Sequence, residues 1–131
     1  MIESLQTHID NLFEFDDNFD KYEYIMSIGK EFNDFLQEDK IEKNYMHGCQ
    51  SQVWLSGKKI DNKYYFIGDS DGLIVKGIVV IMTEAFSGYT KEELNAFHLD
   101  IIRKTPLLKS LTMNRQVGMV AMLEYMKRYD I

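Results

Sequence analysis

The sequence of 131 residues contains a single cysteine, Cys49, and this thiol is the side chain best suited to covalent chemistry. It stands in the segment His47–Trp54, directly after Gly48 and before a run of polar residues. Glycine permits backbone conformations that other residues avoid, and it removes bulk beside the sulfur. Free cysteines are often buried as small apolar side chains, whereas reactive ones favour polar, partly exposed positions. A reactive thiol and a buried structural cysteine therefore both stay open.

Three reaction classes for this thiol meet an obstacle in the sequence. Zinc asks for four ligands, or three and a water, but His8, His47 and His98 are widely separated. A cysteine hydrolase needs a facing base, and a histidine only two residues from the cysteine, as His47 is, seldom has that geometry. His98 cannot be placed from the sequence, so this class is a distant third. A disulfide reductase needs a resolving cysteine, which the chain lacks. What remains is a thiol that carries cargo delivered by a partner protein.

Length and composition predict one globular domain over residues 1–131. The net charge of −6 disfavours nucleic acid as a partner. A lone cysteine excludes an internal disulfide and fits a reducing compartment. The first residues lack the features of a signal peptide, and the longest apolar stretch, Gly77–Met82, is too short to cross a bilayer. We therefore expect a soluble cytoplasmic protein that does not enter the membrane.

The pattern of apolar residues predicts two helices before the cysteine. Ile2–Phe13 places its larger apolar side chains on one side, as in a short amphipathic helix. Asp20 and Glu23 have the spacing of a capping box, and near-helical periodicity continues to Leu36. The charged segment Gln37–Tyr45 has no clear period, so we expect a surface loop there.

Short strands and then helices are predicted after the cysteine. The expected strands and the breaks between them are, in order, Val53–Leu55, a break at Ser56–Lys58, a strand beginning at Ile60, a turn at Asp61 and Asn62, and Tyr64–Ile67. Ser70 is expected to cap a central helix that ends near Gly88. Thr90 with Glu93 matches a capping box, and Thr112 is expected to cap the last helix. This order predicts an α+β fold, a small antiparallel sheet of about three strands covered by helices.

A resemblance to a known family begins at the cysteine. The run Gly48–Trp54, with sequence GCQSQVW, resembles the active-cysteine motif of the SufE and CsdE proteins, the sulfur acceptors of cysteine desulfurases. The similarity continues in Tyr22–Lys30, in Asp69–Gly77, and in Asn114 and Arg115 together with Gly118, Ala121 and Met122. It implies a fold shared with IscU-type scaffold proteins and a role in iron–sulfur cluster assembly.

The resemblance also implies a division of labour between this chain and a partner. In the family, a cysteine desulfurase of the SufS or CsdA type uses its own pyridoxal phosphate to strip sulfur from L-cysteine and hold it as a persulfide. The SufE-like protein accepts that sulfur on the residue matching Cys49, activates the desulfurase, and passes the sulfur towards a cluster scaffold or another acceptor. Neither a metal nor a cofactor of its own is implied, and no independent turnover is expected.

Further site residues follow from the same resemblance. Asp71 and Arg115 match positions that the family associates with the active loop and with partner contact. A cation near the sulfur favours the thiolate, which is the nucleophile. As alternatives, Arg115 is a solvated helix residue, and Asp71 complements the helix macrodipole. The other residues expected to support the site or contact the partner are His47, Gln50 and Gln52.

The chain departs from the family pattern at three places. Thr112 and Met113 stand where Ser-Pro is common, Val117 where Asn is common, and Gly72 where Ala is common, which should loosen the start of the central helix slightly. The first two differences bear on partner choice more than on chemistry. The competing function is a non-catalytic interaction domain with a buried Cys49. Labelling of the thiol only after denaturation would favour it.

Overall fold

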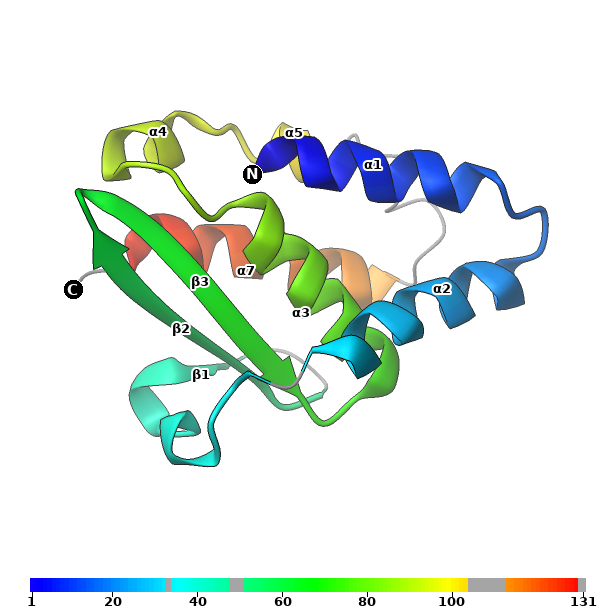
Figure 1. Cartoon of the computed structure of the whole chain (residues 1–131), viewed down its shortest axis with the longest axis horizontal. Coiled ribbons are helices and arrows are strands. Elements are labelled where there is room, and N and C mark those ends of the chain that lie inside the picture. Colours follow the sequence, from blue (N-terminus) through cyan, green and yellow to red (C-terminus); the bar gives the residue numbers. More distant parts are fainter. Residues whose placement is uncertain (33, 48–50, 104–112, 130–131) are drawn as a thin grey trace.

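The computed structural model describes the chain except for residues 33, 48–50, 104–112 and 130–131 (Figure 1). The described part contains helices, two short 3-10 helices and one antiparallel sheet. In chain order the elements are α1 (Ile2–Phe13), α2 (Asn18–Glu31), η1 (Gln37–Asp39), η2 (Glu42–Asn44), β1 (Tyr45–Met46), β2 (Val53–Ile60), β3 (Lys63–Ser70), α3 (Leu73–Ala85), α4 (Lys91–Ala96), α5 (Asp100–Arg103) and α7 (Met113–Arg128). The predicted α+β class, with a small antiparallel sheet and helices segregated from it, is confirmed.

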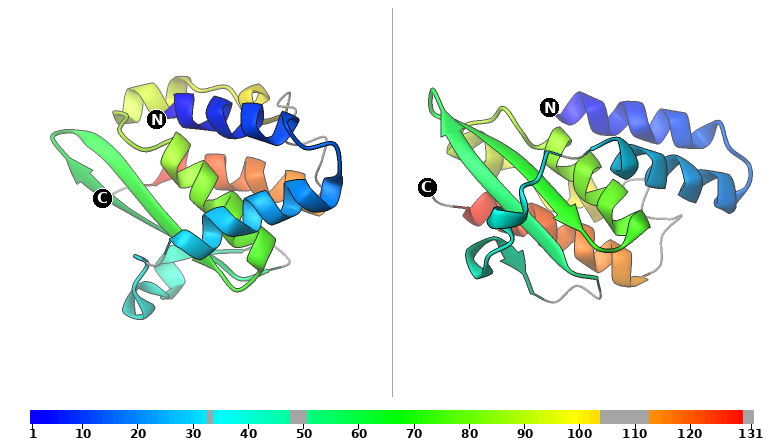
Figure 2. Two further views of the ribbon diagram at one scale, coloured as in Figure 1. Left: turned by 45° about the vertical axis from the view of Figure 1, so that its right-hand side comes forward. Right: turned by 60° about the horizontal axis from the view of Figure 1, so that its bottom comes forward.

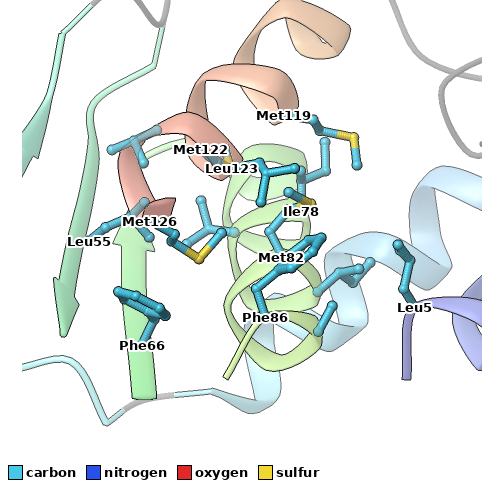
Figure 3. Packing of buried hydrophobic residues seen from close by; sticks show 14 of the residues in the cluster. Leu5, Leu55, Phe66, Ile78, Met82, Phe86, Met119, Met122, Leu123 and Met126 are labelled. Carbon is cyan, nitrogen blue, oxygen red and sulfur yellow. The ribbon is translucent and has the colours of Figure 1, made fainter. Parts of the chain in front are cut away.

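Helix α3 lies at the centre of the core. It contacts α1, α2, α7 and both long strands, and the views in Figures 1 and 2 show it surrounded by these elements. Its sequence explains this position, because every residue from Gly77 to Thr83 is buried. Only a helix that is apolar around most of its circumference can be covered on all sides without leaving polar groups unpaired. Figure 3 shows side chains that meet around α3, including Leu5, Leu55, Phe66, Ile78, Met82, Phe86, Met119, Met122, Leu123 and Met126.

Helices α2 and α3 cross closely at a pair of glycines. A Cβ atom added at Gly77 would overlap the carbonyl group of Ile25 in α2. A Cβ atom at Gly29 would come within 2.8 Å of the backbone nitrogen of Gly77. Backbone-to-backbone contact of this kind is possible only where side chains are missing on both helices. The crossing therefore fixes the start of α3 against α2.

The predicted bounds of α2 are wrong at both ends. Asp17, not Asp20, is the N-cap, and its carboxylate accepts the backbone N–H of Phe19 at 2.7 Å. Asp20 instead lies in the first helical turn, where its charge complements the helix dipole. The helix ends at Glu31, because Phe32 has extended backbone angles, so the apolar residues up to Leu36 lie outside it.

The sheet has longer strands than predicted. The expected break at Ser56–Lys58 is absent, and β2 runs without interruption from Val53 to Ile60. Gly57 pairs with Phe66 within the strand, and glycine leaves room for the Tyr129 ring, which a Cβ atom there would approach to 2.8 Å. The turn at Asp61 and Asn62 is confirmed, with φ angles of 51° and 67° at the two residues. Such positive angles are typical of a tight hairpin turn, in which Asn and Asp are tolerated.

The segment expected to be a surface loop before the cysteine contains structure. It holds η1 and η2, and its last residue, Tyr45, begins β1, which pairs antiparallel with β2. The sheet order is therefore β1-β2-β3, with the two-residue β1 at one edge. The sequence did not predict this structure, because the segment is rich in charged residues and a strand of two residues has no detectable periodic pattern.

The predictions at the later helix ends are mixed. Ser70 is the last residue of β3 rather than a helix cap, and Gly72 is the N-cap of α3. Helix α3 stops at Ala85, and Gly88 follows with a φ of 90° and donates its N–H to Tyr64 at 2.7 Å. The capping box of Thr90 and Glu93 is confirmed in both of its hydrogen bonds. Thr112, the expected cap of α7, lies outside the described residues.

Candidate functional site

The predicted acceptor cysteine belongs to the connection between β1 and β2. Cys49, its neighbour Gly48 and the predicted site residue Gln50 lie outside the described residues. The residues on either side are described, and Met46 pairs antiparallel with Val53. The connection therefore leaves β1 and enters β2 at paired strand positions. We call the described residues on its two sides the entrance stem (Tyr45–His47) and the exit stem (Ser51–Val53).

The exit stem is fastened to the end of β3 by a predicted site residue. The Asp71 carboxylate accepts the backbone N–H of Gln52 at 2.9 Å, and the Asp71 N–H donates to the carbonyl of Gln52 at 3.3 Å. These bonds extend the ladder one step beyond the pair of Val53 and Ser70. The structure thus brings Gln52 and Asp71 together, two residues that the sequence placed far apart. Asp71 precedes the N-cap of α3 and lies outside the first turn, so a first-turn charge does not describe it.

A glycine at the start of α3 makes room for the same stem. A Cβ atom at Gly72 would come within 2.6 Å of the Ser51 hydroxyl oxygen. The Gly72 N–H donates to the side chain of Ser70 at 3.2 Å. The expectation that Gly72 loosens the helix does not fit its place at the N-cap, where glycine costs only a few tenths of a kcal/mol relative to the best caps. The absence of a side chain there instead accommodates the exit stem.

On the entrance stem, His47 is paired with a carboxylate. Its Nε2 atom lies 2.6 Å from the Glu42 carboxylate, and both side chains are exposed. The imidazole also meets the Tyr45 ring edge-on, with ring centroids 4.8 Å apart. This pairing holds the imidazole on η2 at the entrance of the loop. A role of His47 beside the sulfur stays a prediction.

Arg115 lies in the first turn of α7 and packs against α2. Its guanidinium carbon is 5.8 Å from the centroid of the Tyr22 ring, which is a cation–π contact. Arg115 is half-buried, so the alternative of a fully solvated helix residue does not describe it. The contact joins two segments that carry the family resemblance. An effect of this cation on the Cys49 thiol stays a prediction.

Two residues near the site were not singled out from the sequence. Lys40 and Asp69 form an ion pair with Nζ and Oδ2 3.2 Å apart. Asp69 belongs to a segment with a family resemblance, but Lys40 gave no signal because it stands among many charged residues. Only the folded chain shows that this lysine reaches the sheet beside the hairpin.

The histidines do not gather around a metal in the described part of the chain. Among those residues, no group of three or more His, Cys, Asp or Glu side chains could hold a metal ion. His98 lies close to Asp100, with Nδ1 and Oδ2 3.5 Å apart, and His8 contacts the Tyr24 hydroxyl at 2.8 Å. Within the same described ranges, no helix is both long and apolar enough to cross a membrane.

The arrangement of strands and helices matches a solved structure. The solution structure of a hypothetical protein from Thermus thermophilus aligns with a TM-score of 0.72 over 95% of this chain and 90% of that one. The sequence identity is 14%, so the match supports the α+β fold alone.

Sequence comparison identifies the family. Residues 6–130 match the SufE family, described as an Fe-S metabolism associated domain. An uncharacterized SufE-like protein of Rhizobium etli is 34% identical over 126 residues, which cover 92% of this chain and 85% of the relative. A protein of Plasmodium falciparum named cysteine desulfuration protein SufE is 32% identical over 82% of this chain and 45% of its own, longer chain. The chain belongs to the SufE family, and its role lies in iron–sulfur metabolism.

Proposed function

We propose that this chain accepts sulfur from a cysteine desulfurase on Cys49, as a persulfide, and passes it towards iron–sulfur cluster assembly. The observation that carries the proposal is the membership of the SufE family together with the place of the only cysteine, in the GCQSQVW run between β1 and β2. The relative from Plasmodium falciparum, named for cysteine desulfuration, supports it. Removal of sulfur from the desulfurase frees that enzyme for another turnover, so the chain also acts as its activator.

The chemical step is an exchange between sulfur atoms. The Cys49 thiolate attacks the outer sulfur of a persulfide on the desulfurase cysteine, and a new sulfur–sulfur bond forms on Cys49. The bond between the two sulfurs on the desulfurase breaks, and its cysteine leaves as a thiolate. The proton of the donor persulfide stays with the transferred sulfur or passes to solvent. Electrons balance without an external oxidant or reductant.

The chain's own contribution is to hold the thiol where a docked donor can reach it. The exit stem is held by the hydrogen bonds between Gln52 and Asp71. In the proposal, Arg115 supplies positive charge that favours the Cys49 thiolate, since the thiolate and not the thiol is the nucleophile. The polar side chains of His47 and Gln50 support the loop or contact the partner.

The remaining parts of the machinery belong to other proteins. The pyridoxal phosphate that releases sulfur from L-cysteine belongs to the desulfurase, of the SufS or CsdA type, and this chain uses neither a cofactor nor a metal of its own. A cluster scaffold or second acceptor takes the persulfide sulfur next. The chain therefore works as a sulfur-transfer partner without independent turnover, in the cytoplasm.

Intact-mass spectrometry tests the proposal directly. The chain is incubated with the partner desulfurase and L-cysteine, and its mass is compared with that of the Cys49→Ser variant. The expected result is a gain of one sulfur atom in the natural chain, reversed by a thiol reductant, and no gain in the variant. Because the chain has no other cysteine, a gain in Cys49→Ser would contradict the assignment, as would no gain in the natural chain with a genuine partner.

A further inference from the structure

The entrance stem of the Cys49 loop has little backbone support of its own. β1 is two residues long and lies at the edge of the sheet, where only β2 pairs with it. Its pairs are Tyr45 with Trp54 and Met46 with Val53. An isolated ladder of this length is marginal in water, so side-chain contacts must decide how firmly the stem is held.

Met46 anchors the stem in the core, and further contacts, made by the segment before the stem, meet at one carboxylate, Asp69. Its two oxygens pair with Lys40, at 3.2 Å, and with Lys76, at 3.6 Å. The three side chains are only 15–23% exposed, so they are shielded more than an ordinary surface pair. Asp69 lies in β3, Lys40 follows η1, and Lys76 lies in the first turns of α3. One carboxylate therefore ties the segment before the entrance stem to the sheet and to the central helix.

Trp54, the last residue of the GCQSQVW run, completes this contact. It is the strand partner of Asp69, and the Lys40 ammonium lies 5.0 Å from the centroid of its ring. The same ring meets Tyr45 of the entrance stem in an edge-to-face arrangement, with centroids 5.6 Å apart. Lys40 is thus held by a carboxylate and an aromatic face at once, a combination that favours a fixed cation. The thiol chemistry itself assigns no role to this tryptophan.

We propose that Lys40 is a positioning residue for the Cys49 loop. Its ammonium group, held between Asp69 and Trp54, fixes the entrance stem to the same end of the sheet at which Asp71 fixes the exit stem. The effect on sulfur transfer rests on the proposed function, whereas the effect on the loop does not.

Three variants test this role. Lys40→Met keeps an unbranched side chain over Trp54 and removes the charge, and Lys40→Arg restores a cation that can pair and stack. Lys59→Met is the matched control, because Lys59 also lies over an aromatic ring, Tyr64 at 5.7 Å, but is exposed and near the opposite end of β2. Two measurements report on the loop: hydrogen exchange of peptides covering residues 41–47, and acrylamide quenching of Trp54, the only tryptophan.

In Lys40→Met we expect exchange at residues 41–47 to rise about five-fold, the size of effect expected from one partly exposed ion pair. Quenching of Trp54 should increase, and the melting temperature should fall by no more than about 3–5 °C, as about 1 kcal/mol implies for a chain of this size. Lys40→Arg should restore both values, and Lys59→Met should behave like the natural chain. Unchanged exchange and quenching in Lys40→Met would overturn the proposal.

Sulfur uptake measured against desulfurase concentration distinguishes positioning from docking. For a positioning residue, the maximal uptake rate of Lys40→Met should fall about five-fold, while the half-saturating concentration of desulfurase stays within two-fold. A raised half-saturating concentration with an unchanged maximal rate would make Lys40 a docking residue and overturn the proposal, as would unchanged uptake. If the natural chain itself takes up no sulfur, the proposed function fails, and the exchange and quenching results alone decide whether Lys40 holds the loop.

Discussion

Replacing Asp71 with alanine should release the exit stem of the Cys49 loop from the sheet. The Asp71 carboxylate accepts the Gln52 N–H at 2.9 Å, and both residues are exposed. A hydrogen bond to a charged group contributes about 1.5–3 kcal/mol, and solvent screening at an exposed site lowers this, so we expect a loss of about 1 kcal/mol. That free energy corresponds to about five-fold faster exchange of the Gln52 amide. The melting temperature of a chain of this size should fall by about 3–5 °C.

The assay follows the Gln52 amide by nuclear magnetic resonance, beside thermal unfolding and sulfur uptake. Asp71→Asn is the matched control, because its side-chain oxygen can still accept the N–H without the charge, and it should recover at least half of the loss. Sulfur uptake should fall several-fold in Asp71→Ala and less in Asp71→Asn. If the Gln52 amide exchanges at the same rate in Asp71→Ala as in the natural chain, the reasoning that this carboxylate holds the stem is refuted.

Two further substitutions test other contacts. Gly77→Ala should destabilise the chain by about 2 kcal/mol or more in urea unfolding, because the added Cβ overlaps the Ile25 carbonyl group. This loss should outweigh the higher helix propensity of alanine, which is worth about 1 kcal/mol. A more stable variant would contradict the close crossing of α2 and α3. Arg115→Ala should lower sulfur uptake and move the pH profile of Cys49 alkylation to higher pH, while loss of the Tyr22 contact costs only about 0.5–1 kcal/mol of stability. Arg115→Lys should keep most of the uptake, and an unchanged uptake rate in Arg115→Ala would remove this residue from the site.

Several elements could be predicted because their signals lie within a few residues. The capping box of Thr90 and Glu93 forms as expected, since its two hydrogen bonds join residues three positions apart. The turn at Asp61 and Asn62 forms because these residue types tolerate positive φ angles. Local signals also misled: Asp20 has the spacing of a cap, but Asp17 takes the position. Spacing alone cannot choose between two competing acidic residues.

The candidate site likewise has residues that the sequence indicates and contacts that only the fold shows. The run that contains Cys49 is visible in the sequence, and so is the match of Asp71 and Arg115 to family positions. The pairing of Asp71 with Gln52, and of Lys40 with Asp69, joins residues distant in the chain. No local pattern encodes such pairs, because they depend on the register of the sheet and on where the charged segment Gln37–Tyr45 packs against it.

The sequence by itself determined the family, the only thiol available for sulfur chemistry, and a central helix apolar enough to be buried on all sides. Each of these depends on residue types and short spacings, which can be recognised without knowledge of the fold. The tertiary structure decided the length of β2, the presence of β1, and the glycine crossing of α2 and α3. It also decided which residues hold the two stems of the Cys49 loop. These features come from contacts between distant segments, whose free energy exists only once the sheet and the central helix have packed together.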